Sequence, residues 1–226
     1  ISLGLVGSEM CIRDRHNDGN QKNVDAEMII GADGAYSVIR SKMIKQDRFQ
    51  YSQHYIEHGY KELTIPANSD GTHKLEVNAL HIWPRGSYML IALPNMDGSF
   101  TCTLFFPYEG EYSFNNLQTK QQVYNFFKEV FTDTLDLIPN LVEEYFQNPT
   151  SSLAIMRCNP WTVEDKVLLI GDAAHATVPF YGQGMNAGFE GCFVLDQLMQ
   201  KHGEDWQACF DEYSKIRKPD GDGVQD

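Results

Sequence analysis

The stretch that decides the fold is VLLIGDAAHATVPFYGQGMNAG, residues 167–188. Its apolar start belongs to a predicted strand over Lys166–Ile170, which delivers Asp172 just past its carboxyl end, where α/β sheets bind ligands. Gly182 and Gly184 lack a Cβ atom, so the backbone there can approach a ligand closely. A helix is predicted to begin at 184–186, and the free N–H groups of a helix start favour an anion. The stretch therefore predicts a ligand site between this aspartate and this helix start.

The spacing of the glycines is close to a known fingerprint without matching it. Gly182, Gly184 and Gly188 form G-x-G-x-x-x-G, one residue longer than the dinucleotide-binding pattern G-x-G-x-x-G. Glycines alone would fit a purely structural joint between strand and helix. The Gly171-Asp172 pair, placed shortly before them, favours a binding site instead.

Composition excludes several classes of function. The chain has 226 residues and a formal net charge of −13, which argues against nucleic acid and anionic membranes as partners. Apolar residues make up 42% and charged residues 22%, as is usual for a globular protein. The longest apolar runs are much shorter than the roughly 18 residues that a membrane span needs, so no membrane contact is predicted for this segment.

The cysteines and histidines do not form a metal pattern. The five cysteines are widely spaced and contain no C-x-x-C, which predicts reduced thiols in a cytoplasmic protein and no zinc site. His54, His58 and His81 are not at the spacing of metal ligands on any predicted helix, so no metal site is predicted.

The first half of the chain predicts a small α/β segment followed by an antiparallel sheet. A strand over Val24–Ile30 leads into the turn 31–34, and a helix is predicted to follow through Ile44. Turn residues also cluster at 16–20. An Asp-Gly turn over 95–98 predicts a hairpin. The strands predicted for the sheet cover Tyr55–Ile65, Ala79–Trp83, Ser87–Leu93 and Phe100–Phe106.

Helices are predicted mainly in the second half. Thr119 and Gln122 have the spacing of a capping box, and the apolar residues at 123, 126, 127, 130 and 131 lie on one helix face. Residues 218–223 form a turn-like stretch rich in glycine and aspartate. The other predicted elements are a helix over Leu135–Phe146, a strand over Leu153–Arg157, a helix over Gly184–Gln200 and a helix over Glu204–Arg217.

Two motifs carry a resemblance to a known family. The block GDAAH at 171–175, with Pro179-x-x-Gly182-Gln183-Gly184-x-Asn186, resembles the second flavin motif of FAD-dependent aromatic hydroxylases. Asp33-Gly34-x-x-Ser37-x-x-Arg40 resembles their DG motif. Within the family, the branch that acts on L-kynurenine is similar in three further segments, HGYKELTIP at 58–66, LHIWPR at 80–85 and ALPNMDGSFTCTL at 92–104.

The resemblance covers about Val24–Asp226 and implies a fold. It implies a mixed α/β (α+β) chain, part of a Rossmann-like FAD-binding domain with an inserted antiparallel β-sheet substrate domain. The implied boundaries are 16–48 and 158–226 for the FAD-binding part and 49–157 for the substrate domain. Residues 1–15 begin without Met, resemble a translated sequencing adapter, and are predicted to be non-native.

The resemblance also implies roles for individual residues. Asp172 would hold the ribityl chain of FAD, and Met185 and Asn186 would offer backbone N–H groups to the pyrimidine edge of the flavin. Asp33 would help bind FAD near its adenosine side and link to the use of NADPH. The remaining residues implied to bind the cofactor are Pro179, Gly182 and Gly184, and those implied to bind substrate are Phe180 and Tyr181.

The implied activity is the hydroxylation of L-kynurenine to 3-hydroxykynurenine with FAD, NADPH and O₂, in tryptophan degradation. The cofactor does the difficult chemistry in such enzymes, so no catalytic side chain is predicted. His175 is predicted to be a loop histidine satisfied by neighbouring backbone rather than a base. Three alternatives stay open at this point: another flavin-dependent aromatic hydroxylase, a flavin-dependent halogenase or reductase, and a non-catalytic binding module.

Several features of the family are not in this sequence. They are the first flavin segment with its G-x-G-x-x-G turn, the groups that grip the substrate carboxylate, and the C-terminal anchoring helix of eukaryotic members. The chain is therefore expected to be an internal part of a longer protein, to bind FAD poorly and to be inactive by itself. The expected location is the cytoplasm, or the mitochondrial outer membrane if the parent protein is eukaryotic.

Overall fold

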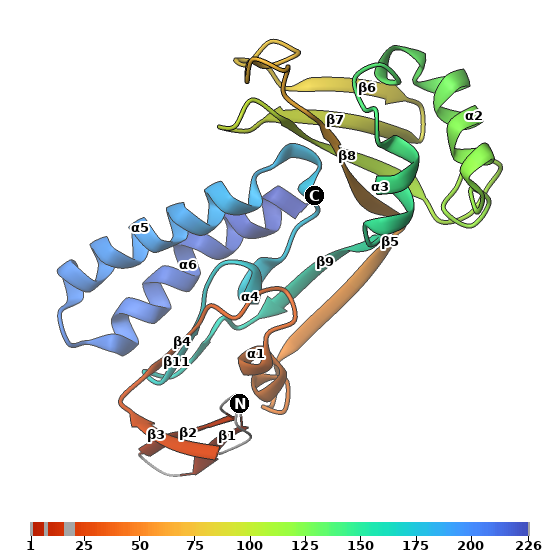
Figure 1. The fold of residues 1–226 in the computed structure, drawn as a ribbon. Coiled ribbons are helices and arrows are strands. Elements are labelled where there is room, and N and C mark those ends of the chain that lie inside the picture. The colour runs from red at the N-terminus through yellow and green to blue at the C-terminus, as the bar shows by residue number, and fades with distance from the viewer. Residues whose placement is uncertain (1, 7–8, 16–20, 226) are drawn as a thin grey trace. The chain divides into compact units, whose positions relative to one another are not determined.

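The computed structural model describes residues 2–6, 9–15 and 21–225 and divides the chain into two compact units (Figure 1). Unit 1 comprises Ile1–His54 and Ala154–Asp226, and unit 2 comprises Tyr55–Leu153. Two long strands, β5 (Gln50–Ile65) and β9 (Ser151–Asn159), carry the chain across the boundaries between the units. The predicted mixed α/β class is confirmed, whereas the turn predicted at 16–20 lies outside the described residues.

Unit 2 is built on a sheet with the strand order β6-β7-β8-β5-β9. Strands β6 (His81–Arg85), β7 (Tyr88–Pro94) and β8 (Phe100–Pro107) form consecutive antiparallel pairs, and β5 pairs antiparallel with the far side of β8. The hairpin predicted between β7 and β8 is confirmed, since the Asn95 N–H donates to the Ser99 carbonyl at 2.8 Å.

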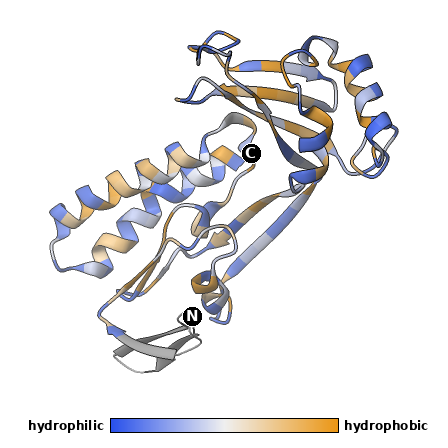
Figure 2. Cartoon of the chain, in the orientation of Figure 1, coloured by the Kyte–Doolittle hydropathy of each residue, from blue (hydrophilic) through white to orange (hydrophobic). Residues whose placement is uncertain are grey.

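One face of this sheet forms the core of unit 2. Alternate residues of β5 and β8 are buried, and Leu63 stands opposite Cys102 in the antiparallel register. Hydrophobic residues follow β7 and β8 in Figure 2. The core residues of the sheet pack against the helices α2 (Lys120–Val130) and α3 (Leu141–Gln147), which contribute Phe126, Phe127 and Tyr145.

The structure confirms the predicted start of one helix of unit 2 and corrects the predicted start of the other. The capping box is confirmed at the start of α2, because Thr119 and Gln122 bond to each other's backbone N–H groups. The helix predicted over Leu135–Phe146 is wrong in its first half, since α3 begins only at Leu141. Pro139 explains the late start, because proline has no N–H to donate inside a helix and restricts the residue before it.

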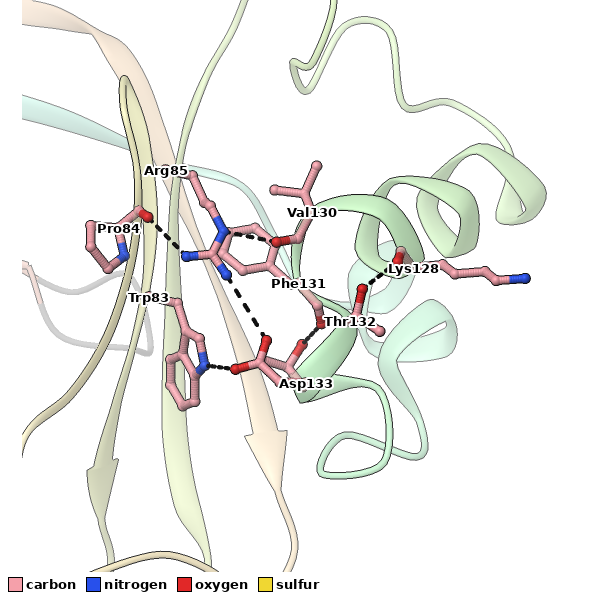
Figure 3. A network of polar contacts seen from close by, with 9 residues as sticks. Trp83, Pro84, Arg85, Lys128, Val130, Phe131, Thr132 and Asp133 are labelled. Atoms are coloured by element: carbon pink, nitrogen blue, oxygen red, sulfur yellow. Dashed lines mark hydrogen bonds and ion pairs between the residues drawn. The ribbon is translucent and has the colours of Figure 1, made fainter.

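A polar network fastens the end of α2 to strand β6 (Figure 3). The Arg85 guanidinium donates from Nε to the Val130 carbonyl at 2.8 Å and lies 5.0 Å from the centre of the Phe131 ring. Asp133, in the short 3-10 helix η1 (Thr132–Thr134), accepts a 2.6 Å hydrogen bond from the Trp83 indole. An arginine at a helix C-terminus satisfies a free carbonyl and complements the helix dipole, so this network stabilises α2.

Unit 1 holds the segments that carry both flavin-like motifs. Its small sheet has the order β10-β11-β4, with β11 parallel to β4 and antiparallel to β10. A second sheet pairs three strands antiparallel in the order β1-β2-β3. The strands are β1 (Ser2–Val6), β2 (Glu9–Arg15), β3 (Gln21–Ala26), β4 (Ile29–Gly31), β10 (Thr162–Val163) and β11 (Val167–Leu169).

The strand predicted over Val24–Ile30 is two strands in the structure. The chain bends at 27–28, because β3 pairs with β2 whereas β4 pairs with β11. The helices of unit 1 are α1 (Val38–Met43), α4 (Asp172–His175), the 3-10 helix η2 (Pro179–Tyr181), α5 (Gly184–His202) and α6 (Trp206–Gln225). Helices α5 and α6 run side by side as a hairpin (Figure 1).

Helix α6 corrects the prediction of a turn at 218–223. The helix continues to Gln225 with Pro219 inside it. Contacts with the core explain this, because the Gln225 amide donates to the carbonyls of Met156 and Ala176, both at 2.9 Å. Tertiary contacts of this kind override weak helix propensity. Within the helix, Lys218 also pairs with Asp222 one turn later, at 2.6 Å. No helix in the described part of the chain is long and apolar enough to cross a membrane.

Candidate cofactor site

The DG motif forms the start of α1. Asp33 accepts a 2.5 Å hydrogen bond from the Ser37 hydroxyl on Oδ1 and bonds from the N–H groups of Val38 and Ile39 on Oδ2, at 2.7 and 3.2 Å. Ser37 is the N-cap of α1, and its hydroxyl accepts from the Arg40 N–H at 2.9 Å. The carboxylate and hydroxyl together satisfy the free donors of the helix start, which fixes the loop that carries Asp33.

These bonds set the charge state of Asp33. Partial burial alone would raise the pKa of its carboxyl, but the hydrogen bonds from Ser37 and from the Ile39 and Val38 backbone outweigh burial and lower the pKa below its usual value. A hydrogen-bonded carboxylate of this kind stays ionised well below neutral pH. The DG loop therefore places a negative charge beside α1.

The GD motif follows strand β11 as a tight turn. Gly171 has φ +55° and ψ −144°, a conformation open to glycine and strained for other residues, and it is the N-cap of α4. The N–H groups of Ala174 and His175 both donate to the Gly171 carbonyl, at 2.9 and 3.0 Å. This turn presents Asp172 at the carboxyl end of β11, as the sequence predicted.

The start of α5 is held in place by α6. Arg217, a buried residue of α6, donates to the Ala187 carbonyl at 3.2 Å and pairs with Glu190 at 2.9 Å, both in the first turns of α5. On the other side, η2 ends at Gly182, whose φ of +63° lies in the left-handed region that glycine tolerates. The predicted helix start at Gly184 is confirmed.

The two motifs and the start of α5 meet at one pocket in unit 1. The pocket has a volume of about 330 Å³. Asp172 and Met185 both line it, so the carboxylate-bearing turn and the helix start lie at the same site. The described lining residues are Ala32, Gly34, Ile170, Gly171, Asp172, Met185, Gly188, Phe189 and Cys192.

The shape and chemistry of this pocket fit part of a flavin nucleotide. A Cβ added at Gly34, Gly171 or Gly188 would meet no atom within 4 Å, so these glycines leave room along the wall. Met185 and Phe189 expose 69% and 67% of their surface and offer apolar contacts for a planar ring. Asp172 supplies acceptors for hydroxyl groups, and the α5 start supplies free N–H groups. Its volume suits one part of a dinucleotide rather than all of it.

Other predicted residues lie near this pocket without lining it. Asp33 lies in sequence between two residues that line the pocket, and its carboxylate accepts hydrogen bonds from the start of α1. Gly184 begins α5, and Asn186 donates its side-chain amide to Gln183 Oε1 at 3.1 Å. Phe180 is half-buried in η2. The predicted residues absent from the described lining are Asp33, Pro179, Phe180, Gly182, Gly184 and Asn186, whereas the side chain of Tyr181 lies outside the described part of the chain.

The sequence analysis missed four side chains that line the pocket, those of Ala32, Ile170, Phe189 and Cys192. Phe189 and Cys192 follow Met185 at four and seven residues along α5, so they share its helix face. That spacing was visible in the sequence and could have identified them. The described residues contain no group of three or more His, Cys, Asp or Glu side chains that could hold a metal ion.

His175 packs against an aromatic partner directly behind the GD turn. It is the last residue of α4 rather than a loop residue, and its ring stacks on Trp161 at 5.0 Å and 25°. A Cβ on Gly221 of α6 would come within 3.1 Å of the His175 ring, so glycine is needed for this close approach. Burial lowers the pKa of His175. The negative charge of nearby Asp172 raises this pKa, but by less than burial lowers it. The imidazole is therefore neutral near pH 7.

This depressed pKa predicts a pH-dependent stability. The unfolded chain binds the proton of His175 near pH 6.5, whereas the folded chain binds it only at lower pH. Stability is therefore complete above about pH 6.5 and falls as the pH drops from there toward the lower folded pKa. We expect His175→Phe to flatten this dependence in urea unfolding measured between about pH 5 and 7.5. The exposed His54→Phe is the control, and equal slopes in wild type and His175→Phe would contradict the assignment.

Comparison with known proteins defines the family to which this chain belongs. The FAD binding domain family model matches residues 8–226, and the chain therefore belongs to that family.

Among curated proteins, the chain is 61% identical over 206 residues to kynurenine 3-monooxygenase of Flavobacterium psychrophilum. The aligned segment covers 91% of this chain and 46% of that protein. It is 48% identical over 207 residues to kynurenine 3-monooxygenase of Sus scrofa, covering 91% of this chain and 43% of that protein. The resemblance stated from the sequence is thus confirmed, and the chain spans less than half the length of these relatives.

Solved structures agree on the fold. A variant of Klebsiella pneumoniae HpxO complexed with FAD has a TM-score of 0.72 with 17% identity, covering 99% of this chain and 55% of that one. The likeness extends across both units, so the inserted sheet is part of the shared fold.

Proposed function

We propose that this chain is part of an FAD-dependent monooxygenase that hydroxylates L-kynurenine to 3-hydroxykynurenine with NADPH and O₂. The observation that carries the proposal is the meeting of Asp172 and the α5 start at one pocket, in a chain 61% identical to a kynurenine 3-monooxygenase. The free cysteines Cys102, Cys158, Cys192 and Cys209 support a cytoplasmic location.

Each side of the pocket has a proposed task toward FAD. Asp172 would accept hydrogen bonds from the ribityl hydroxyls, and Met185 and Asn186 would offer their backbone N–H groups to the pyrimidine edge of the flavin. Because α5 is 19 residues long, the positive end of its dipole stabilises negative charge at that edge. FAD, when bound, supplies the electron transfer and the activation of O₂.

The other predicted residues have supporting roles in the proposal. Asp33 holds the loop that brings Ala32 and Gly34 to the pocket, and through this loop it contributes to the adenosine side of FAD. Gly182 and Gly184 shape the approach to the α5 start. Pro179, Phe180 and Tyr181 form the η2 segment directly before it, which we assign to the ring of the cofactor and to the substrate.

The cofactor part of the proposal is tested by titrating FAD into the chain and following flavin fluorescence. We expect weak but saturable quenching, because the chain spans less than half of its relatives' length. We expect Asp172→Asn to weaken this binding further, by roughly tenfold to a hundredfold, since hydrogen bonds to a charged group contribute about 1.5–3 kcal/mol. Asp196→Asn removes another carboxylate, on the exposed part of α5, and serves as the matched control. Equal affinities of the two variants would contradict the role of Asp172.

The catalytic part needs a complete enzyme. Residues 24–225 can replace the matching segment of the Flavobacterium psychrophilum relative, to which the chain is 61% identical. We expect this chimera to oxidise NADPH faster when L-kynurenine is added and to release 3-hydroxykynurenine. A chimera that binds FAD yet leaves L-kynurenine unchanged would contradict the proposed substrate.

A further inference from the structure

Arg40 is a buried cation that has no acidic partner among the described residues. Its exposed surface is 3%, and in the described part of the chain no carboxylate lies within ion-pairing distance of its guanidinium. A buried charge is costly unless hydrogen bonds or an opposite charge compensate it. Arg40 Nε has no hydrogen-bond partner among the described residues, so the compensation comes from the contacts of Nη1 and Nη2.

Those contacts join segments that are far apart in the sequence. Nη1 donates to the Ala173 carbonyl at 2.7 Å and lies 3.4 Å from the Asp172 carbonyl. Nη2 donates to the Ala35 carbonyl and to the Met156 sulfur, the latter at 3.2 Å. The guanidinium also lies over the Tyr51 ring, 5.0 Å from its centre. One side chain thus bonds the DG loop, strand β9 and the GD turn.

We propose that Arg40 is the positioning residue of the cofactor turn, and this rests on the proposed function of Asp172. Its two nitrogens hold the Asp172 and Ala173 carbonyls at a fixed distance from the Ala35 carbonyl. The loop next to Gly34 and the turn that carries Asp172 both line one pocket, and Arg40 fixes their positions relative to each other. The planar fork of arginine is required, because the single nitrogen of lysine cannot reach both segments in this geometry.

The decisive variant is Arg40→Lys, which keeps the charge and removes the fork. We expect the amides of Ala174 and His175, which donate to the Gly171 carbonyl, to exchange hydrogen about tenfold faster or more in the chain without cofactor. We expect FAD affinity to fall about tenfold as well, as for the loss of a hydrogen bond to a charged group. Met43→Leu, a buried change of similar volume in α1, is the matched control that should alter neither.

A rescue experiment separates positioning from general damage to the fold. Arg40→Ala leaves a space with carbonyl and sulfur acceptors, and guanidinium at about 20 mM, far below denaturing concentrations, should restore slow exchange at Ala174 and His175. Sodium chloride at the same concentration should not. If Arg40→Ala does not fold, Arg40→Lys still decides the question.

The outcomes distinguish this inference from the proposed function. Unchanged exchange at Ala174 and His175 in Arg40→Lys would overturn the positioning role, whatever happens to FAD. Faster exchange in a chain whose wild type does not bind FAD would uphold the positioning of the turn and overturn the assignment of the pocket. Faster exchange with unchanged FAD affinity would overturn the link between turn and cofactor.

Discussion

Truncating Trp161 to alanine is expected to destabilise unit 1 by about 3–5 kcal/mol, as for other large buried aromatic side chains. Trp161 is 1% exposed and the largest of the fully buried described side chains. Its indole stacks on His175 and donates from Nε1 to the Cys158 carbonyl at 3.0 Å. The loss therefore removes the packing behind the GD turn, and FAD affinity should fall together with stability.

Trp161→Phe separates the two contributions of this side chain. Phenylalanine keeps a ring against His175 but leaves the Cys158 carbonyl without its donor, which should cost about 1–3 kcal/mol. Urea unfolding followed by segment-resolved hydrogen exchange measures both variants. If Trp161→Ala lost no more stability than Trp161→Phe, the ring would not support the turn.

The second large effect is expected in unit 2. Phe127 is fully buried in α2 and lies 5.4 Å from both the Phe126 and Phe131 ring centres. Phe127→Ala removes this ring from the core between helix and sheet and should cost about 3–5 kcal/mol. For a unit of this size, that loss lowers the melting temperature by about 10 °C or more.

The two truncations control for each other, because the core residues of units 1 and 2 form separate clusters. Hydrogen exchange should rise first in 55–153 for Phe127→Ala and in the α5–α6 hairpin for Trp161→Ala. Phe127→Leu, which retains most of the apolar volume, should lose clearly less than Phe127→Ala. Equal loss of protection in both units for either variant would contradict separate cores.

Local patterns in the sequence predicted much of the fold. The Asp-Gly turn, the capping box at Thr119 and the strand that ends before Asp172 each depend on interactions within a few residues. The late start of α3 was also predictable, because Pro139 acts on its immediate neighbours. The continuation of α6 past Pro219 was not, since it depends on contacts with Met156 and Ala176.

The candidate site shows the same division between local and distant contacts. Asp172 and Met185 were predicted to share a site because both belong to one sequence motif, and the structure places both in the lining of one pocket. Their roles in binding FAD stay predictions. The contact of Arg40 with the Ala173 carbonyl joins residues 133 positions apart, and no local pattern reveals it. The same holds for Gly221, whose packing on His175 appears only in three dimensions.

The pairing of Ile29 with Val167 has a consequence for biogenesis. Strand β4 leaves the ribosome early, but its neighbour β11 emerges only after the whole of 55–153 has been made. Unit 2 is continuous in sequence, so its sheet and helices can assemble during translation, before the β11 partner of β4 has been synthesised. Closing so long a loop is slow, and the pocket lined by Asp172 and Met185 is therefore among the last features to form.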